Sequence, residues 1–235
     1  MIVLPAILPQ TKKRPDRPEF EESYLIPDLD QYHNFWSPVY EAIRDMNIAS
    51  PVENPIQEKI NPVFGYFGYR VHPVKRTAKY FHTGLSLDLE SGTEIKSVLP
   101  GVLEYSGYGA VNGYYVLLSH PQIQTEDGYV LHTMYCHLKK PAVKFNSYQK
   151  MLREISLGSY PIVEIDNQTV LGTASTSGMS RENKPGMYLQ FSFRKFDKTN
   201  IAINPLPCYI DDHGENNSSN ITDQAEIDIL FPSLS

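Results

Sequence analysis

Two short segments of the chain alternate polar and apolar residues and carry the side chains most capable of chemistry. They are residues 81–88 and 187–193, and their main polar residues are His82, Ser86, Asp88, Tyr188 and Gln190. Histidine nitrogen and carboxylate oxygen are donors with which proteins hold zinc, and histidine is also a common general base near neutral pH. A serine hydroxyl and a glutamine amide bring no charge to offset a dication. These segments therefore offer hydrogen-bonding groups more readily than metal ligands.

Strand geometry predicts that the polar side chains share one surface, because successive side chains point to opposite faces of a strand. Along the second segment one face holds Tyr188, Gln190 and Ser192, and the other holds Leu189, Phe191 and Phe193. The apolar set is expected in the core and the polar set in a groove. By the same parity Tyr135 and His137 face opposite to Cys136. We therefore expect Cys136 to be a buried structural thiol rather than a nucleophile.

The composition is that of a soluble, β-rich globular protein. The chain has 235 residues, of which 41% are hydrophobic and 20% charged, enough to bury a sizeable core. Its net charge of -6 leaves no surplus of Lys and Arg to neutralise phosphates, which argues against nucleic-acid binding. Sixteen tyrosines and eighteen prolines against fourteen glycines indicate strands joined by long, stiff connections.

No segment has the features of a membrane span or a disulfide framework. The apolar run at residues 1–9 is too short to cross a bilayer, contains two prolines and lacks a basic start, so no signal peptide is evident. The sequence does not say whether a leader has been removed. Two cysteines, Cys136 and Cys208, are too few for a disulfide framework, and it stays open whether they are bridged.

Residues 1–58 are predicted to form an extended arm followed by a helical pair. The Pro-rich, charged stretch to about residue 27 favours an arm or linker. Capping residues and helical spacing predict short helices over 28–36 and 37–47. We expect the pair to pack on the main domain through Trp36, Tyr40 and Ile43; a separate functional module is the alternative.

Residues 59–210 are predicted to form an all-β domain, because short alternating runs are separated by Gly, Pro and Asn. The expected strands are 82–89, 94–98, 101–106, 113–119, 129–138, 169–174 and 186–195. An insertion at about 140–168 has helical composition at 146–155 and is a candidate lid over the groove. The polar, acidic residues 211–235 are predicted to be a loosely held tail.

A series of short markers runs in one order between residues 61 and 207. The markers occupy residues 68–73, 82–84, 92–93, 100–102, 115–120, 135–138, 168–172, 177–178 and 204–205. Two of them read Gly-Tyr-Arg-Val-His-Pro and Tyr-Cys-His-Leu. Each is weak alone, but in order they resemble the lysostaphin/LytM-type zinc endopeptidases, which cut peptidoglycan cross-bridges. The resemblance implies a mainly β fold of the LytM type, a folded antiparallel sheet (barrel-sandwich, or duplicated hybrid motif) with a groove between loops.

The departures from the family fall on its chemistry. The resemblance places the three zinc ligands of the family at His82, Ser86 and Gln190, and its two catalytic histidines at His137 and Tyr188. A catalytic zinc needs about three protein ligands and a water, and without it no bound water becomes a nucleophile near neutral pH. Tyr188 also lacks the neutral-range titration of a histidine. We therefore expect no zinc or other cofactor and no catalytic residue.

Asp88 is the one candidate for a rescued metal site. It shares a strand face with Ser86 but lies about 6.5 Å further along, whereas zinc–oxygen bonds are about 2 Å long. A kink would be required. The other histidines, expected to be scaffold or surface residues or to point to another face, are His33, His72, His120 and His132. No phosphate-binding glycine loop, Gly-x-Ser-x-Gly elbow or evident glycosidase carboxylate pair occurs.

The leading hypothesis is a pseudo-peptidase: a non-catalytic, LytM-like domain in the periplasm or elsewhere outside the cytoplasm. Its groove, lined by His82, Ser86, His137, Tyr188 and Gln190, would bind a peptidoglycan peptide or a cell-envelope protein as regulator or scaffold. One alternative is an active zinc endopeptidase with a rearranged site of His82, Asp88 and His137. A second is a structural component of an envelope assembly that recognises partners through Trp36 and Tyr40.

Overall fold

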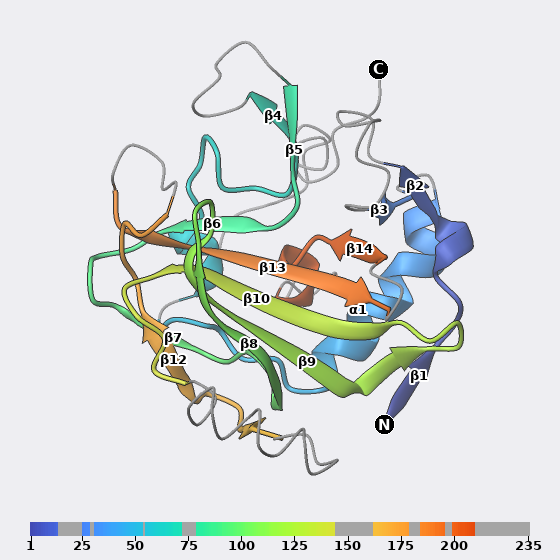
Figure 1. Cartoon of the computed structure of the whole chain (residues 1–235). Coiled ribbons are helices and arrows are strands. Elements are labelled where there is room, and N and C mark those ends of the chain that lie inside the picture. The colour runs from blue at the N-terminus through green and yellow to red at the C-terminus, as the bar shows by residue number, and fades with distance from the viewer. Residues whose placement is uncertain are drawn as a thin grey trace.

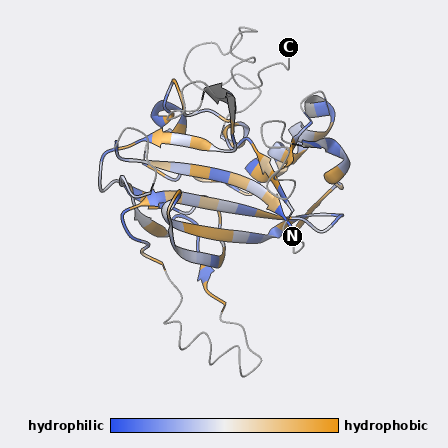
Figure 2. Ribbon diagram, turned by 45° about the horizontal axis from the view of Figure 1, so that its top comes forward, coloured by the Kyte–Doolittle hydropathy of each residue, from blue (hydrophilic) through white to orange (hydrophobic). Residues whose placement is uncertain are grey.

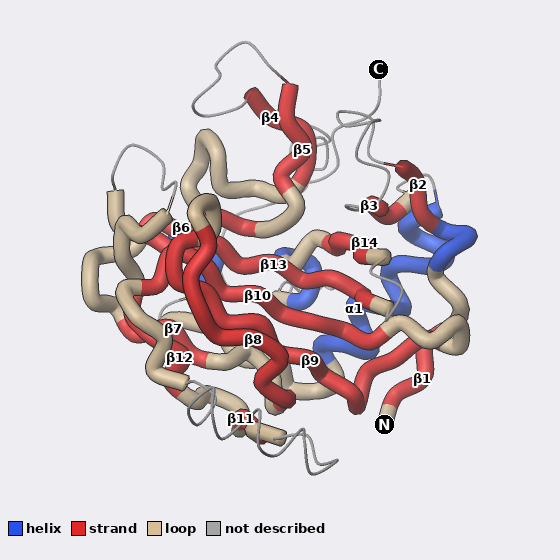
Figure 3. The backbone as a smooth tube through the Cα atoms, viewed as in Figure 1, coloured by secondary structure: helices blue, strands red, loops and turns tan. Residues whose placement is uncertain are grey.

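The fold is built on one large mixed sheet (Figures 1 and 3). The computed structural model describes residues 1–13, 25–28, 31–53, 55–71, 79–143, 162–178, 184–195 and 199–209. The helix predicted at 146–155 and the tail predicted at 211–235 lie outside the described residues. No helix within the described part of the chain is both long and apolar enough to cross a membrane.

Four long antiparallel neighbours form the centre of the sheet. They are β8 (Gly101–Gly109), β9 (Gly113–Thr125), β10 (Val130–Leu138) and β13 (Gly186–Arg194). The same edge of β13 then pairs antiparallel with β6 (Leu85–Asp88) and β14 (Asn200–Ile203). The alternation in the sequence predicted all of these strands except β14. The mainly β prediction is confirmed, and the described strands follow an open path that does not close into a barrel.

The N-terminal residues complete this sheet at separate places, instead of forming the predicted arm or linker. β1 (Ile2–Leu4) pairs parallel with β9, β3 (Leu25–Pro27) pairs parallel with β14, and β2 (Thr11–Lys13) pairs antiparallel with β3. Leu4 and Ile7 are buried. The apolar N-terminus therefore belongs to the core, and its two parallel pairings make the sheet mixed rather than antiparallel throughout.

Short elements surround the large sheet. Two of them are two-stranded ladders, one of β7 (Glu94–Lys96) with β12 (Val170–Thr173) and one of β4 (Gly68–Val71) with β5 (Lys79–His82). The remainder are β11 (Glu164–Ile165) on the edge of β8 and the 3-10 turns η1 (Leu8–Gln10), η4 (Ile56–Lys59) and η6 (Leu206–Cys208). The strand predicted over 82–89 is broken, since β5 ends at His82 and β6 begins at Leu85.

One continuous helical segment, not two helices, packs behind the sheet (Figure 1). A π-helical turn, η3 (Tyr32–Trp36), leads directly into α1 (Ser37–Arg44), which has a proline in its first turn. Trp36, Tyr40 and Ile43 are buried in the main core, as predicted. The Tyr40 hydroxyl also accepts a hydrogen bond from the Asn204 N–H at 3.1 Å. These burials make Trp36 and Tyr40 unavailable to a partner, against the second alternative hypothesis.

The two faces of the sheet have different characters, as the alternating colours along the strands in Figure 2 indicate. One face meets α1 and includes Leu189, Phe191 and Phe193, all fully buried as predicted. The opposite face, here called the outer face, carries Tyr188, Gln190 and Ser192. Since directly paired residues of antiparallel strands share a face, Ser86 and Met134 also belong to the outer face, opposite Tyr188 and Gln190 respectively.

Candidate binding site on the outer face

A glycine brings the first polar segment against the second. Gly84 lies where the chain turns from β5 into β6, and a Cβ there would collide with the Leu189 carbonyl and come within 2.9 Å of the Tyr188 ring. Only a residue without a side chain allows this approach. The turn places His82 beside Tyr188, with ring centroids 5.2 Å apart, and Ser86 directly opposite Tyr188 in the ladder.

Both ring nitrogens of His82 are engaged within the protein. The side chain is 3% exposed, and its Nδ1 lies 2.8 Å from the Tyr66 carbonyl oxygen. A carbonyl only accepts, so Nδ1 carries the proton and donates. Nε2 lies 3.1 Å from the Ser86 hydroxyl and accepts its hydrogen. The lone pair that a metal would need is therefore directed at Ser86.

Tyr188 and Gln190 differ in how well they are satisfied. The Tyr188 hydroxyl is hydrogen-bonded to the Thr83 hydroxyl at 2.7 Å. Gln190 is 3% exposed, yet its Nε2 is buried without a hydrogen-bond partner among the described residues. Such a group costs about 1–3 kcal/mol, because it loses water and gains nothing in return. The unpaired amide of Gln190 therefore destabilises the folded protein at this site.

His137 lies at a bulge in β10, directly after Cys136, the partner of Tyr188 in the ladder. Its backbone is left-handed, with φ 63°, and the pairing with β9 shifts between Tyr135 and Leu138. Nδ1 lies 2.8 Å from the Ser177 carbonyl, to which it donates. Burial lowers the pKa of His137, partly opposed by that carbonyl, so the ring is neutral near pH 7 and Nε2 carries a lone pair.

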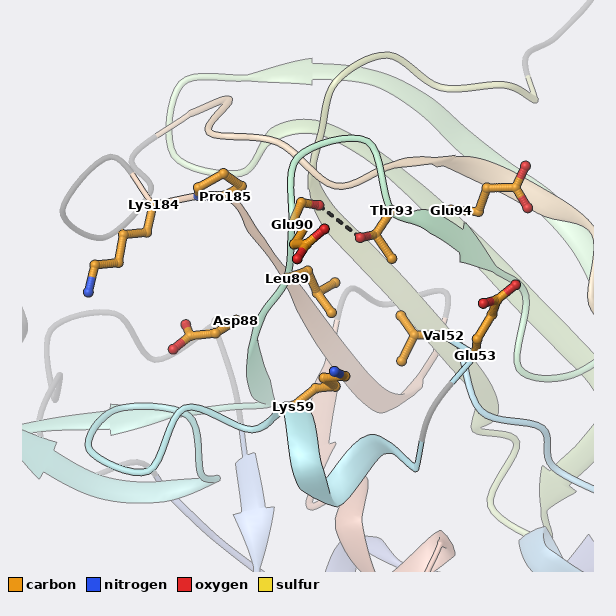
Figure 4. A pocket seen from close by; sticks show the side chains of 10 residues that line it. All are labelled: Val52, Glu53, Lys59, Asp88, Leu89, Glu90, Thr93, Glu94, Lys184 and Pro185. Carbon is orange, nitrogen blue, oxygen red and sulfur yellow. Dashed lines mark hydrogen bonds between the residues drawn. The ribbon is translucent and has the colours of Figure 1, made fainter.

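Asp88 lies at the end of β6, away from His82. Its exposed carboxylate accepts a hydrogen bond from the Asn61 amide at 2.5 Å and lines a cleft of about 720 Å³ (Figure 4). The charged residues of this cleft are Glu53, Lys59, Asp88, Glu90, Glu94 and Lys184. Four carboxylates and two lysines line it, and its lining includes none of the other predicted site residues.

The remaining histidines have scaffold contacts where they are described. His120 is buried, donates from Nδ1 to the Pro100 carbonyl and accepts at Nε2 from the Thr133 hydroxyl, each at 2.8 Å. Burial lowers its pKa to about 4. His132 lies on the outer face opposite Ser192, contrary to the prediction that it points away from the site. His72 and the side chain of His33 lie outside the described residues.

The parity argument for Cys136 was half right. The thiol is buried and free, as is that of Cys208, and burial raises the pKa of both. However, Cys136 pairs directly with Tyr188 and so shares the outer face instead of pointing away from it. The prediction assigned Tyr135 and His137 to the groove face, but Tyr135 is fully buried opposite Leu189, so regular alternation puts Cys136 on the outer face. Thr83 and Tyr66 were missed entirely, because only the folded turn reveals their contacts.

The donor set at His82, Ser86 and Gln190 does not fit a zinc ion. One imidazole, already paired, stands with a neutral hydroxyl and a neutral amide, where a catalytic zinc takes about three nitrogen, sulfur or carboxylate donors. Nor does the described part of the chain bring any three His, Cys, Asp or Glu residues close enough to hold a metal. What the arrangement offers is hydrogen bonding, from an amide, an imidazole lone pair and two hydroxyls.

No protein-family model and no curated protein matches the chain. Among solved structures, it is similar to the catalytic domain of the antimicrobial peptidase lysostaphin from Staphylococcus simulans, with 20% identity, 66% of this chain and 97% of that chain covered, and a TM-score of 0.42. A zinc-containing peptidase from Vibrio cholerae matches at 18% identity over 68% of this chain and 39% of that chain, with a TM-score of 0.44.

A third similar structure, the SpoIIQ–SpoIIIAH pore-forming complex, matches at 19% identity over 70% of this chain and 90% of that chain, with a TM-score of 0.43. The peptidases among these structures are of the type that the sequence markers resemble. This likeness concerns the fold alone and says nothing about activity.

Proposed function

We propose that this chain is a non-catalytic, LytM-like domain outside the bacterial cytoplasm that binds an extended peptide on the outer face of its sheet. The peptide is either a peptidoglycan stem peptide or a segment of an envelope protein. The observation that carries the proposal is the buried Gln190 amide without a hydrogen bond. Buried polar groups are nearly always paired, so an unpaired one calls for an explanation. The explanation offered by the proposal is that the Gln190 side chain turns outward and pairs with the bound peptide.

An extended peptide suits the groups of this site. Its backbone presents carbonyl acceptors and N–H donors in alternation, and an amide side chain can pair with both. Gln190 provides that amide, while the His137 Nε2 lone pair accepts one further hydrogen. Half-buried Met134, directly opposite Gln190 in the ladder, adds an adaptable apolar contact.

Three features support binding without hydrolysis. The His82 lone pair is directed at Ser86, the two other family ligand positions are the neutral Ser86 and Gln190, and the Tyr188 hydroxyl is engaged by Thr83. Hydrolysis by a zinc-bound water needs charged or imidazole ligands that these positions do not supply. The active-site alternative built on His82, Asp88 and His137 gains no support from the Asp88 contact with Asn61.

The test compares binding and cleavage on the same purified chain. Soluble stem peptides from a peptidoglycan digest are titrated by NMR, while zinc content and released peptides are measured in parallel. We expect saturable shifts at Gln190 and Met134, zinc far below one ion per chain, and no new peptide. Stoichiometric zinc with peptide release would overturn the proposal, whereas binding of an envelope protein segment in place of stem peptides would select the second ligand source.

The same titration on Gln190→Met separates a specific site from surface adhesion. The variant should bind the peptide more weakly, because the amide partner is gone. Gln122→Met is the matched control, since Gln122 already donates to the Pro100 carbonyl at 2.7 Å and lies outside the site. Equal affinity in the native chain and Gln190→Met would remove Gln190 from the binding site and the main support of the proposal.

A further inference from the structure

The hairpin formed by β8 and β9, labelled in Figure 1, carries uncharged aromatic side chains on both faces that the proposed peptide site does not use. Residues 105–115 contain four tyrosines and no charged residue, in a chain that is 20% charged. Tyr105, Tyr108 and Tyr114 are 41%, 57% and 36% exposed. Large exposed aromatic side chains grouped on one hairpin mark an interaction surface more often than single exposed apolar residues do.

Two of these rings stack face to face on the outer face. Tyr105 and Tyr115 have ring centroids 4.8 Å apart and an angle of 22° between their planes. Tyr105 pairs with Leu117, which pairs with Met134 and so belongs to the outer face; Tyr115 is two residues from Leu117 on the same face. Tyr108 and Tyr114 form an edge-to-face pair instead, with planes at 69° in the next row of the ladder.

A glycine makes room for the Tyr105 ring of the stacked pair. A Cβ on Gly107 would come within 2.6 Å of the Tyr105 hydroxyl and 2.8 Å of its ring carbon Cζ. The Tyr105 ring therefore lies across the Gly107 backbone rather than standing away from the sheet. Burial raises the pKa of Tyr115, and neighbouring Tyr105 raises it further, so its hydroxyl stays uncharged. The result is a neutral ring surface with hydroxyl groups at its edge.

The hairpin tip is fixed before any ligand arrives. The Asn112 carbonyl accepts from the His137 N–H at 2.8 Å, and the Tyr114 N–H donates to the Ser177 hydroxyl at 3.1 Å. A Cβ on Gly178 would collide with Gly113, so these two backbones are in close contact. A surface that is already ordered loses little conformational entropy when it binds.

We propose that the Tyr105–Tyr115 stack is a binding platform for a neutral polysaccharide. A pyranose ring has an apolar face of C–H bonds, which packs on an aromatic face, and an edge of hydroxyls that pair with tyrosine hydroxyls. The platform matches this chemistry with aromatic ring faces and hydroxyl groups, and residues 105–115 include no charged residue. A protein interface of usual size has a core of several buried apolar side chains, whereas Val111 is the one large exposed aliphatic residue in this segment.

The platform lies apart from Gln190 but borders His137. Tyr105, Leu117, Met134 and Gln190 follow one another on four adjacent strands, and three strand spacings place Tyr105 about 14 Å from Gln190. The His137 N–H, in contrast, donates to the Asn112 carbonyl at the hairpin tip. The saccharide proposal therefore does not depend on the peptide proposal, and Gln190→Met is expected to leave saccharide binding unchanged.

The test titrates the full chain with two hexasaccharides, one of β-1,4-linked N-acetylglucosamine and one of β-1,4-linked glucose, and follows the tyrosine ring resonances by NMR. We expect saturable shifts at Tyr105 and Tyr115 with at least one sugar. Tyr105→Ala should weaken binding about tenfold, the weight of one aromatic contact, while Tyr105→Phe, which keeps the ring, should stay within about twofold. A difference in affinity between the two sugars would show whether the protein contacts the acetamido group.

Tyr108→Ala is the matched control, since Tyr108 is more exposed but belongs to the edge-to-face pair; it should bind as the native chain does. Gly107→Ala lifts the Tyr105 ring without removing it, and should weaken binding even if Tyr105→Ala folds poorly. The proposal is overturned by three results: no shift with either sugar, equal losses in Tyr105→Ala and Tyr108→Ala, or self-association or protein binding through Tyr105 in place of sugar binding.

Discussion

Replacing Gln190 by methionine should stabilise the folded protein while weakening its proposed binding. Methionine has nearly the length and shape of glutamine but no amide, so the substitution removes a buried donor that lacks a partner. The unfolded chain loses only a hydrated group. We therefore expect the free energy of unfolding to rise by about 1–3 kcal/mol, an unusual sign for a change at a 3% exposed position.

The size of this effect is within reach of calorimetry. For a chain of this length, 1 kcal/mol corresponds to about 2–4 °C in Tm, so the expected rise is about 2–12 °C. Urea unfolding at pH 7 should give the same sign through a higher midpoint with an unchanged slope. Gln122→Met, whose amide is paired with the Pro100 carbonyl, should show no gain.

The same substitution connects stability to binding. If a ligand pairs with the amide, its loss should weaken stem-peptide affinity about 5–150-fold, which corresponds to about 1–3 kcal/mol. A lower Tm in Gln190→Met would refute the reasoning, because it would show that the amide is satisfied in the folded chain. A higher Tm with unchanged affinity would confirm that the Gln190 amide is unpaired in the folded chain but would remove its role in binding.

Three further predictions concern the scaffold and the site. Burial lowers the pKa of His120 to about 4, so the unfolded chain binds more protons than the folded chain between pH 6.5 and 4. The free energy of unfolding should therefore fall by about 3 kcal/mol as the pH is lowered from 6.5 to 4. Urea unfolding at these two pH values checks this, and His120→Asn should lack this change. Joint replacement Ser86→Asp and Gln190→His restores three zinc donors, so excess zinc should raise Tm by several degrees only in this variant, corresponding to about 2–3 kcal/mol at a hundred times Kd. Gly84→Ala should lower the free energy of unfolding by about 1–3 kcal/mol, because the new methyl group would collide with the Leu189 carbonyl and the Tyr188 ring. Gly109→Ala should leave it unchanged, since the nearest atom there is at 3.5 Å. Thermal unfolding of the two variants checks the difference.

Local patterning predicted the strands because burial and alternation coincide along them. Leu189, Phe191 and Phe193 alternate with polar residues, and this alternation is sufficient to place β13 and its core face. Helical spacing in the same way placed Trp36 and Ile43 in the core. The N-terminal strands were missed because their pairing partners, such as Ile123 for Ile2, lie far along the chain and leave no local signal.

The sequence predicted which of the polar residues lie near one another, but not their geometry. Markers placed His82, Ser86, Tyr188 and Gln190 together, and the β6–β13 ladder brings them near one another. The left-handed backbone of His137 could not be predicted, since neither glycine nor asparagine signals it. The face of Cys136 was misassigned because the polar Tyr135, expected in the groove, is buried in the core. Burial of the Gln190 amide depends on tertiary packing around Met134, which parity alone does not reveal.

Zinc analysis combined with peptide titration on one untagged preparation distinguishes a site that only binds peptides from one that hydrolyses them. We expect saturable binding of stem peptides, a metal content far below stoichiometric, and intact peptide after long incubation. Cleaved peptide whose release follows bound zinc and stops on chelation would contradict this expectation.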